Sequence, residues 1–125
     1  PYERISPNPI QHSFSPQHEL RINPICRYIM NHFNDPLTVE KVASVSGMST
    51  SNFCKFFKKA TGKTFSDYVN EIRIQEACIL LRETERKIGT IASDCGFETL
   101  SYFNRVFLTK KKCRPMAYRK DFLGR

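Results

Sequence analysis

Residues 88–107 read IGTIASDCGFETLSYFNRVF, and residues 39–57 read VEKVASVSGMSTSNFCKFF. The two stretches align residue for residue as far as the residue after the glycine. After one extra residue in the later stretch, the phenylalanines at the end of the two stretches also align. Each stretch predicts a short helix, a glycine turn and a second helix with inward phenylalanines, which is the sequence form of a helix-turn-helix. Two units are too few for a solenoid, so we expect two small lobes, each with its own three-helix core.

The region before the first repeat shows where the first lobe begins. Residues 1–22 are rich in proline and polar side chains and lack helical periodicity, so we expect a linker from an upstream domain. Asn23 and Pro24 form a helix-start signal, and Asn34-Asp35-Pro36 forms a stop. The chain also begins with Pro1 rather than Met, which indicates a piece of a longer protein.

Capping and turn residues predict the remaining helix boundaries. Thr38 and Ser49 are positioned to cap the two helices of the first repeat, and Thr64 opens a capping box for a longer helix. Gly47 and Gly96 occupy equivalent turn positions, where we expect a positive φ. The predicted all-α architecture is lobe one over about 23–63, a linker helix over about 65–83 and lobe two over about 84–125.

The charge of the chain favours a polyanionic partner. Its 125 residues carry 20 Lys and Arg against 12 Asp and Glu, for a net charge of +8, and 40% hydrophobic residues are enough for a modest core. Residues 84–125 hold ten of the cations and four of the acids. The apolar runs are far shorter than the roughly 20 residues that cross a bilayer, so we expect no membrane association.

The five cysteines do not form a recognisable pattern. Their number is odd, and no Cys-x-x-Cys pair occurs, which argues against a disulfide framework and against a zinc site. We therefore expect reduced thiols in a cytoplasmic protein and no metal or other cofactor.

The second helix of each repeat has an outward face suited to the major groove of double-stranded DNA. Lys55 and Arg105 align, and either can donate to guanine, while Asn104 has the geometry to pair with adenine. The predicted base-contacting residues are Thr50, Ser51, Cys54, Lys55, Leu100, Ser101, Asn104 and Arg105. The predicted phosphate-contacting residues are Ser49, Lys58, Lys59, Thr99, Lys110, Lys111 and Arg119. A solvated charged surface is the alternative interpretation of the lysines.

Taken in order, these residues resemble the DNA-binding domain of the AraC/XylS family of bacterial transcription regulators. The family pattern is matched from about residue 25 to 122, and most closely by Ile88, Ile91-Ala92, Gly96-Phe97, Ser101-Tyr102-Phe103-Asn104-Arg105-Val106-Phe107 and Pro115-Met-Ala-Tyr118-Arg119. The resemblance implies seven helices, two helix-turn-helix units joined by one long helix, and activation or repression of transcription at an asymmetric promoter site. It also implies an upstream sensing or dimerisation domain and RNA polymerase as a partner.

Three positions depart from the family pattern, which usually has Gly at Lys112, Ser or Thr at Arg114, and Pro at Phe65. Lys112 must then adopt a left-handed turn at a cost of about 1 kcal/mol relative to Gly.

Two other classes of function stay open at this stage. One is an enzyme or reactive-thiol sensor that uses Cys54, although no basic partner except Lys55 and Lys58 lies near that cysteine in the sequence. The other is a helical protein-interaction module. We predict a DNA-binding protein and not an enzyme.

Overall fold

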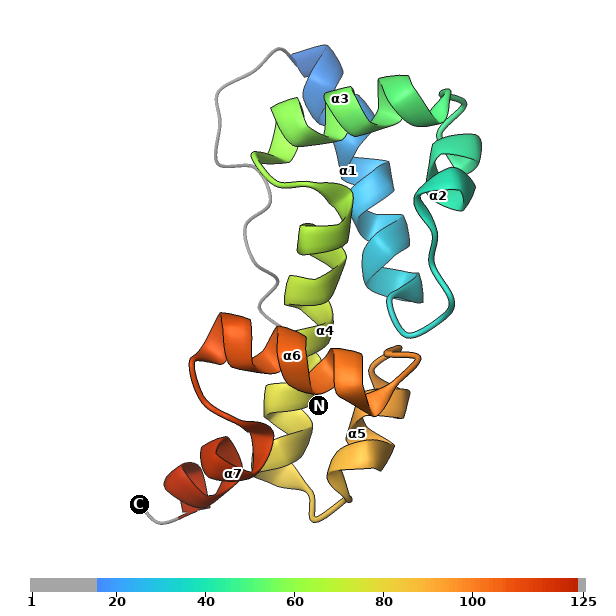
Figure 1. Cartoon of the computed structure of the whole chain (residues 1–125). Helices are drawn as coiled ribbons and strands as arrows, with labels where there is room; N and C mark the ends of the chain where they lie inside the picture. Colours follow the sequence, from blue (N-terminus) through green and yellow to red (C-terminus); the bar gives the residue numbers. More distant parts are fainter. Residues whose placement is uncertain (1–15, 124–125) are drawn as a thin grey trace. The chain divides into compact units, whose positions relative to one another are not determined.

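The computed structural model describes residues 16–123, which form seven α-helices and no β-strand in that range (Figure 1). The prediction of an all-α fold with seven helices is confirmed. The helices are α1 (Pro16–His32), α2 (Val39–Val45), α3 (Thr50–Thr61), α4 (Phe65–Glu83), α5 (Ile88–Asp94), α6 (Leu100–Lys111) and α7 (Pro115–Leu123).

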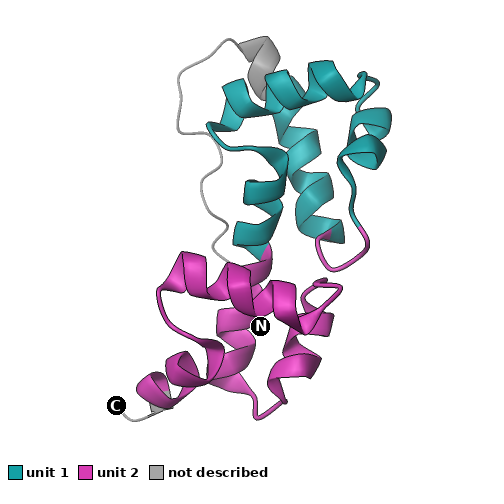
Figure 2. Cartoon of the chain, in the orientation of Figure 1, with its two compact units in different colours: residues 1–32, 37–72 teal, residues 33–36, 73–125 magenta. Residues whose placement is uncertain are grey.

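The chain divides into two compact units (Figure 2). The first contains α1, α2, α3 and the part of α4 up to Ile72, and the second contains the rest of α4 with α5, α6 and α7. The first half of α4 contributes buried side chains to the first unit, and its second half contributes Ile74, Ala77 and Leu81 to the core of the second. The linker helix is therefore part of both cores.

Residues 33–36, which connect α1 to α2, belong to the second unit although they follow a helix of the first. The lobe boundaries predicted from the sequence had placed these residues in lobe one, over about 23–63.

The prediction that the first helix begins at Asn23 and Pro24 is wrong. Helix α1 begins at Pro16 and has Pro24 in its interior. Ile22 is completely buried, and Ile25 and Ile29 continue the same buried face. Burial of this apolar face outweighs the proline signal, so residues 16–22 are helical instead of a linker. The rest of the predicted linker, residues 1–15, lies outside the described part of the chain.

Side-chain caps begin the helices where the sequence predicts them. The Thr38 hydroxyl accepts a hydrogen bond from the Lys41 amide at 3.1 Å, and Ser49 accepts one from Asn52 at 3.2 Å. Thr64 accepts one from the Asp67 amide at 3.1 Å. Each bond satisfies an amide that has no partner within the helix, and the three predicted caps are confirmed.

The turns of the repeat require left-handed backbone. Gly47 has φ of 74° and Gly96 has φ of 99°, as predicted. Lys112 ends α6 with φ of 64°, and among the described residues it is the sole non-glycine with positive φ. The departure from the family pattern at Lys112 thus keeps the backbone conformation that glycine would favour.

The structural repeat is longer than the sequence repeat. The buried face of α1 matches that of the second half of α4 at a spacing of 52 residues, since Ile22, Cys26 and Ile29 correspond to Ile74, Cys78 and Leu81. Burial raises the pKa of these two cysteines, and the tyrosines that lower it in part, Tyr68 for Cys26 and Tyr118 for Cys78, are 50 residues apart.

Candidate nucleic-acid interface

Helix α3 has a buried aromatic face and an exposed polar face. Phe53 and Phe57 have no exposed surface, and both rings contact Phe65, with centroids 5.7 and 5.9 Å apart. The prediction that these aromatics are core is confirmed. The opposite face is exposed and carries Thr50, Ser51, Cys54, Lys55, Lys58 and Lys59.

Helix α6 repeats this arrangement in the second unit. Phe103 and Phe107 are fully buried, and Phe103 packs edge-on against Phe97 at 5.1 Å between ring centroids. Leu100 and Leu108 are 46% and 43% exposed, so two large apolar side chains also face outward. The outward face holds Leu100, Ser101, Arg105 and Leu108, with the half-buried Asn104 at its edge.

Arg105 and Lys55 are equivalent in the repeat but have different surroundings. The guanidinium of Arg105 lies 5.1 Å from the ring centroid of Tyr102, on the same helix. Asn52 occupies the position of Tyr102 in the first unit and offers no ring. The aromatic ring restricts the Arg105 side chain before any ligand binds, so less conformational entropy remains to be lost.

Two of the predicted phosphate-contacting residues, Ser49 and Thr99, are the N-caps of α3 and α6. The Ser49 hydroxyl accepts a hydrogen bond from the Asn52 amide and caps α3, and the Thr99 hydroxyl accepts one from the Tyr102 amide at 3.1 Å at the start of α6. The amino ends of both helices therefore lie at the edge of the exposed faces, where the helix dipole favours anions.

The predicted phosphate-contacting lysines lie at the carboxyl ends of the same two helices. Lys58 and Lys59 are exposed in the last turn of α3. Lys111 is exposed and Lys110 is half-buried in the last turn of α6. Each outward face thus has cations at one end and helix amides at the other.

Arg119 has a structural role that sequence reasoning missed. Its Nε donates to the carbonyl oxygen of Leu81 and its Nη2 donates to that of Thr84, both at 3.0 Å. The Leu81 carbonyl lies in the last turn of α4 and the Thr84 carbonyl directly after it, where the backbone lacks helical partners. Arg82 adds a second link, because it donates to the hydroxyl of Tyr118 at 2.9 Å. The two arginines hold α7 against the end of α4.

The cysteines are mostly part of the core. Cys26, Cys78 and Cys95 are buried, and burial raises the pKa of the Cys26 and Cys78 thiols, which keeps them protonated. Cys54 is exposed on α3. Within residues 16–123, no group of three or more His, Cys, Asp or Glu could hold a metal ion, and no helix is long and apolar enough to span a bilayer.

Known proteins share the arrangement of helices described above. Residues 42–121 match the profile of a helix-turn-helix domain family. The regulatory protein SoxS of Escherichia coli K12 is 34% identical over 102 residues, which are 82% of this chain and 95% of SoxS. The chain belongs to the AraC/XylS family. Its two units are therefore AraC-type helix-turn-helix units, and α3 and α6 are the second helices of those units.

Other members and structures extend the likeness of this AraC-type domain. The regulatory protein PocR of Salmonella typhimurium is 38% identical over 104 residues, covering 83% of the chain but 34% of PocR, so the chain spans about a third of that relative. The C-terminal domain of the response regulator AraT from Geobacillus stearothermophilus superposes with a TM-score of 0.79 at 30% identity, covering 88% of each chain. The DNA-binding domain of AdpA, solved with a target DNA, has the same fold, with a TM-score of 0.80 at 22% identity over 83% of this chain and 94% of that one.

Proposed function

We propose that this AraC-type chain is the sequence-specific DNA-binding domain of a bacterial transcription regulator and that α3 and α6 enter successive major grooves of one promoter site. The observation that carries the proposal is the pair of equivalent helices, each with phenylalanines fully buried on one face and polar and cationic side chains exposed on the other. A major groove about 12 Å wide admits a helix presented in this way.

The outward side chains provide base contacts of different kinds in the two halves of the site. On α6, Arg105 has the planar fork that pairs with guanine, and the amide of Asn104 suits adenine. The exposed Leu100 suits the methyl group of thymine. On α3, the contacts would come from Lys55 and from small polar side chains, namely Thr50, Ser51 and Cys54. Because the two faces differ, the preferred site is asymmetric.

Phosphate contacts would position both helices on the duplex. Lys58 and Lys59 serve α3, while Lys110 and Lys111 serve α6, and all four act through charge without reading sequence. The amino ends of α3 and α6, capped by Ser49 and Thr99, add main-chain donors for further phosphates. Arg119 remains a proposed phosphate contact through the part of its guanidinium that does not bind the α4 carbonyls.

The length of α4 supports a site that spans two grooves. The helix has 19 residues, which at 1.5 Å per residue corresponds to about 28 Å. One turn of B-DNA is about 34 Å, so the two halves of the site are expected about one turn apart on the same face of the duplex.

The partners that we propose for the complete protein are suggested by its relatives. The AraT structure is named as a C-terminal domain, and PocR is much longer than this chain, so we place an upstream sensing or dimerisation domain before residue 1. A transcription regulator of this kind acts with RNA polymerase in the cytoplasm. The comparisons point to a regulator family and not to an enzyme family, and we propose no catalytic activity and no cofactor.

Selection of bound duplexes from a random pool tests this function directly. We expect enrichment of one asymmetric sequence with two unlike half-sites about 10 base pairs apart. Arg105→Ala serves as a matched variant, because it alters the outward face without touching the buried one. Recovery of a palindrome, or of no sequence preference at any salt concentration, would exclude the two-groove proposal and favour a protein-interaction module.

A further inference from the structure

The two repeated units differ in what packs against the glycine of the turn. In the second unit, the connection of residues 33–36 lies against Gly96. A Cβ atom on Gly96 would lie 2.5 Å from the Phe33 carbonyl oxygen and 2.9 Å from the Asn34 Cα. A main chain can come this close because glycine has no side chain. The groove beside this turn therefore holds a peptide turn.

Arg73 fastens that peptide turn through its main chain. The Arg73 Nε donates to the Phe33 carbonyl oxygen at 2.7 Å, and Nη2 donates to the Asp35 carbonyl oxygen at 3.1 Å. The same guanidinium lies 5.8 Å from the ring centroid of Phe97. The recognition depends on two carbonyl groups and on the fork geometry of arginine, so it needs no particular side chain in the bound peptide.

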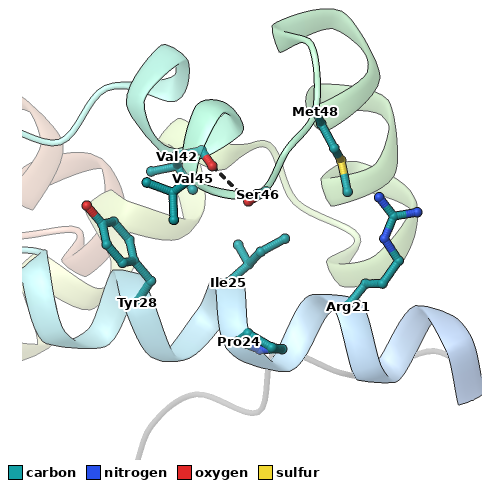
Figure 3. A pocket seen from close by; sticks show the side chains of 8 residues that line it. All are labelled: Arg21, Pro24, Ile25, Tyr28, Val42, Val45, Ser46 and Met48. Carbon is teal, nitrogen blue, oxygen red and sulfur yellow. Dashed lines mark hydrogen bonds between the residues drawn. The ribbon is translucent and has the colours of Figure 1, made fainter.

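The equivalent groove in the first unit is open. A Cβ atom on Gly47, the counterpart of Gly96, would meet no atom within 4 Å. Beside this turn lies a pocket of about 260 Å³ between α1 and the α2–α3 turn (Figure 3). Its lining is largely apolar and comes entirely from the first unit: Arg21, Pro24, Ile25, Tyr28, Val42, Val45, Ser46 and Met48.

Arg21 is the counterpart of Arg73 in this open groove. The two arginines are 52 residues apart, the same spacing that relates the buried faces of α1 and α4. Figure 3 shows the Arg21 side chain at one end of the pocket, reaching toward Met48, which stands at the position of Phe97. The guanidinium lies 5.1 Å from the ring centroid of Phe56. The first unit thus has an arginine at the equivalent position of the repeat.

The open groove is also more apolar than the filled one. Val45 is 56% exposed, although it is a β-branched apolar residue. Its counterpart in the second unit is Asp94, whose carboxylate pairs with Arg86 at 2.9 Å. The rim of the open pocket thus presents an apolar side chain where the filled groove has an ion pair.

We propose that the groove between α1 and the α2–α3 turn binds a peptide turn of the polypeptide that precedes this domain in the complete regulator. Arg21 donates to main-chain carbonyls of that turn, its backbone packs on Gly47, and an apolar side chain enters the pocket beside Val45 and Met48. The inference rests on the proposed function only for the existence of the upstream domain.

The position of the groove supports this source for the peptide. Helix α1 begins at Pro16, so Arg21 is its sixth residue, and Pro24 and Ile25 follow within the next turn. The polypeptide that precedes α1 is therefore joined to the helix within about two helical turns of the groove. The internal counterpart is likewise filled by a segment of the same chain, the connection of residues 33–36.

Oxidation footprinting with hydrogen peroxide tests the docking, because Met48 lines the pocket. We expect Met48 to be oxidised at least five times more slowly in the complete regulator than in the 125-residue chain. Met116 on α7, which is 48% exposed, is the internal control and should change less than twofold. Peptide mass spectrometry measures both rates in the same sample.

Matched variants decide whether the groove itself is responsible. Arg21→Gln and Val45→Gln should each restore fast oxidation of Met48 in the complete regulator, whereas Arg27→Gln, an exposed position on the same helix outside the pocket, should not. Equal Met48 rates in the two proteins, protection that survives both groove variants, or a complete protein with no domain before residue 1 would overturn the inference. DNA affinity, measured separately on each variant, reports on the proposed function alone.

Discussion

Substitution of alanine at three glycines should give three different changes in stability, because the three glycines differ in backbone conformation and in the atoms around them. Gly89 lies inside α5 with ordinary helical backbone and open space around it. Gly47 has a positive φ and open space, and Gly96 has a positive φ and a main chain packed against it. The same substitution therefore separates helix propensity, backbone conformation and close packing.

The magnitudes follow from these surroundings. Gly89→Ala should stabilise the protein by about 0.5–1 kcal/mol, because alanine loses less backbone entropy in a helix. Gly47→Ala should cost about 1–2 kcal/mol for a left-handed alanine. Gly96→Ala carries the same conformational cost and also forces the Phe33 carbonyl away from a Cβ only 2.5 Å distant.

The movement at Gly96 has a further consequence for Arg73. Its hydrogen bonds to the carbonyls of Phe33 and Asp35 depend on the position of that connection. A hydrogen bond from a charged group contributes about 1.5–3 kcal/mol, so loss of one brings the total for Gly96→Ala to about 3 kcal/mol or more.

Urea unfolding followed by far-ultraviolet circular dichroism measures all three changes, since every secondary-structure element of the described residues is an α-helix. The expected order of stability is Gly89→Ala, wild type, Gly47→Ala and Gly96→Ala. If Gly96→Ala costs no more than Gly47→Ala, the close packing of residues 33–36 on the turn is refuted. A loss of stability in Gly89→Ala would refute the assignment of open space there.

Four further outcomes are expected from the proposed interface and its support. Arg105→Ala should cost about 1–3 kcal/mol on the selected duplex and relax base preference in one half-site, and Lys55→Ala should do the same more weakly in the other half; relaxation at the same base pairs in both would contradict separate reading. Lys111→Ala should weaken all duplexes alike and lower the log-log salt slope by about one unit, and an effect confined to one sequence would exclude a phosphate contact. Arg119→Ala should destabilise the protein by about 1–3 kcal/mol in urea, because two hydrogen bonds to the α4 carbonyls at 3.0 Å are lost, and unchanged stability would disprove that role. Cys54→Ser should leave folding intact and DNA affinity nearly unchanged, since serine is similar in size and keeps a donor; binding that responds to oxidant only when Cys54 is present would instead indicate a thiol sensor.

Local signals in the sequence were sufficient for most helix boundaries. The caps at Thr38, Ser49 and Thr64 act within three residues, so their hydrogen bonds depend on nearby backbone alone. The four-residue spacing of Phe53 and Phe57 likewise predicts one buried face without reference to the rest of the chain. The outward faces of α3 and α6 follow from the same spacing, which is why the candidate DNA-contacting residues could be named in advance.

The start of α1 could not be read in this way. Pro24 is a local signal for a helix start that here lies inside the helix, because Ile22 belongs to the core of the first unit and is fully buried. The gain from burying apolar surface depends on what packs against it, and the sequence alone does not show that. The same applies to Arg119, which reads as a surface cation and instead caps α4 from 35 to 38 residues away in sequence.

The sequence by itself determined the repeat, the helix caps, the left-handed glycine turns and the cationic outward faces, because each of these follows from interactions within a few residues or from periodicity along one helix. Only the tertiary structure showed that residues 33–36 fill the groove of the second unit while the equivalent groove of the first is open. Gly47 and Gly96 are the same residue in the same local pattern with the same sign of φ. What differs is the chain that packs against them, and that is set by contacts between residues that are distant in sequence.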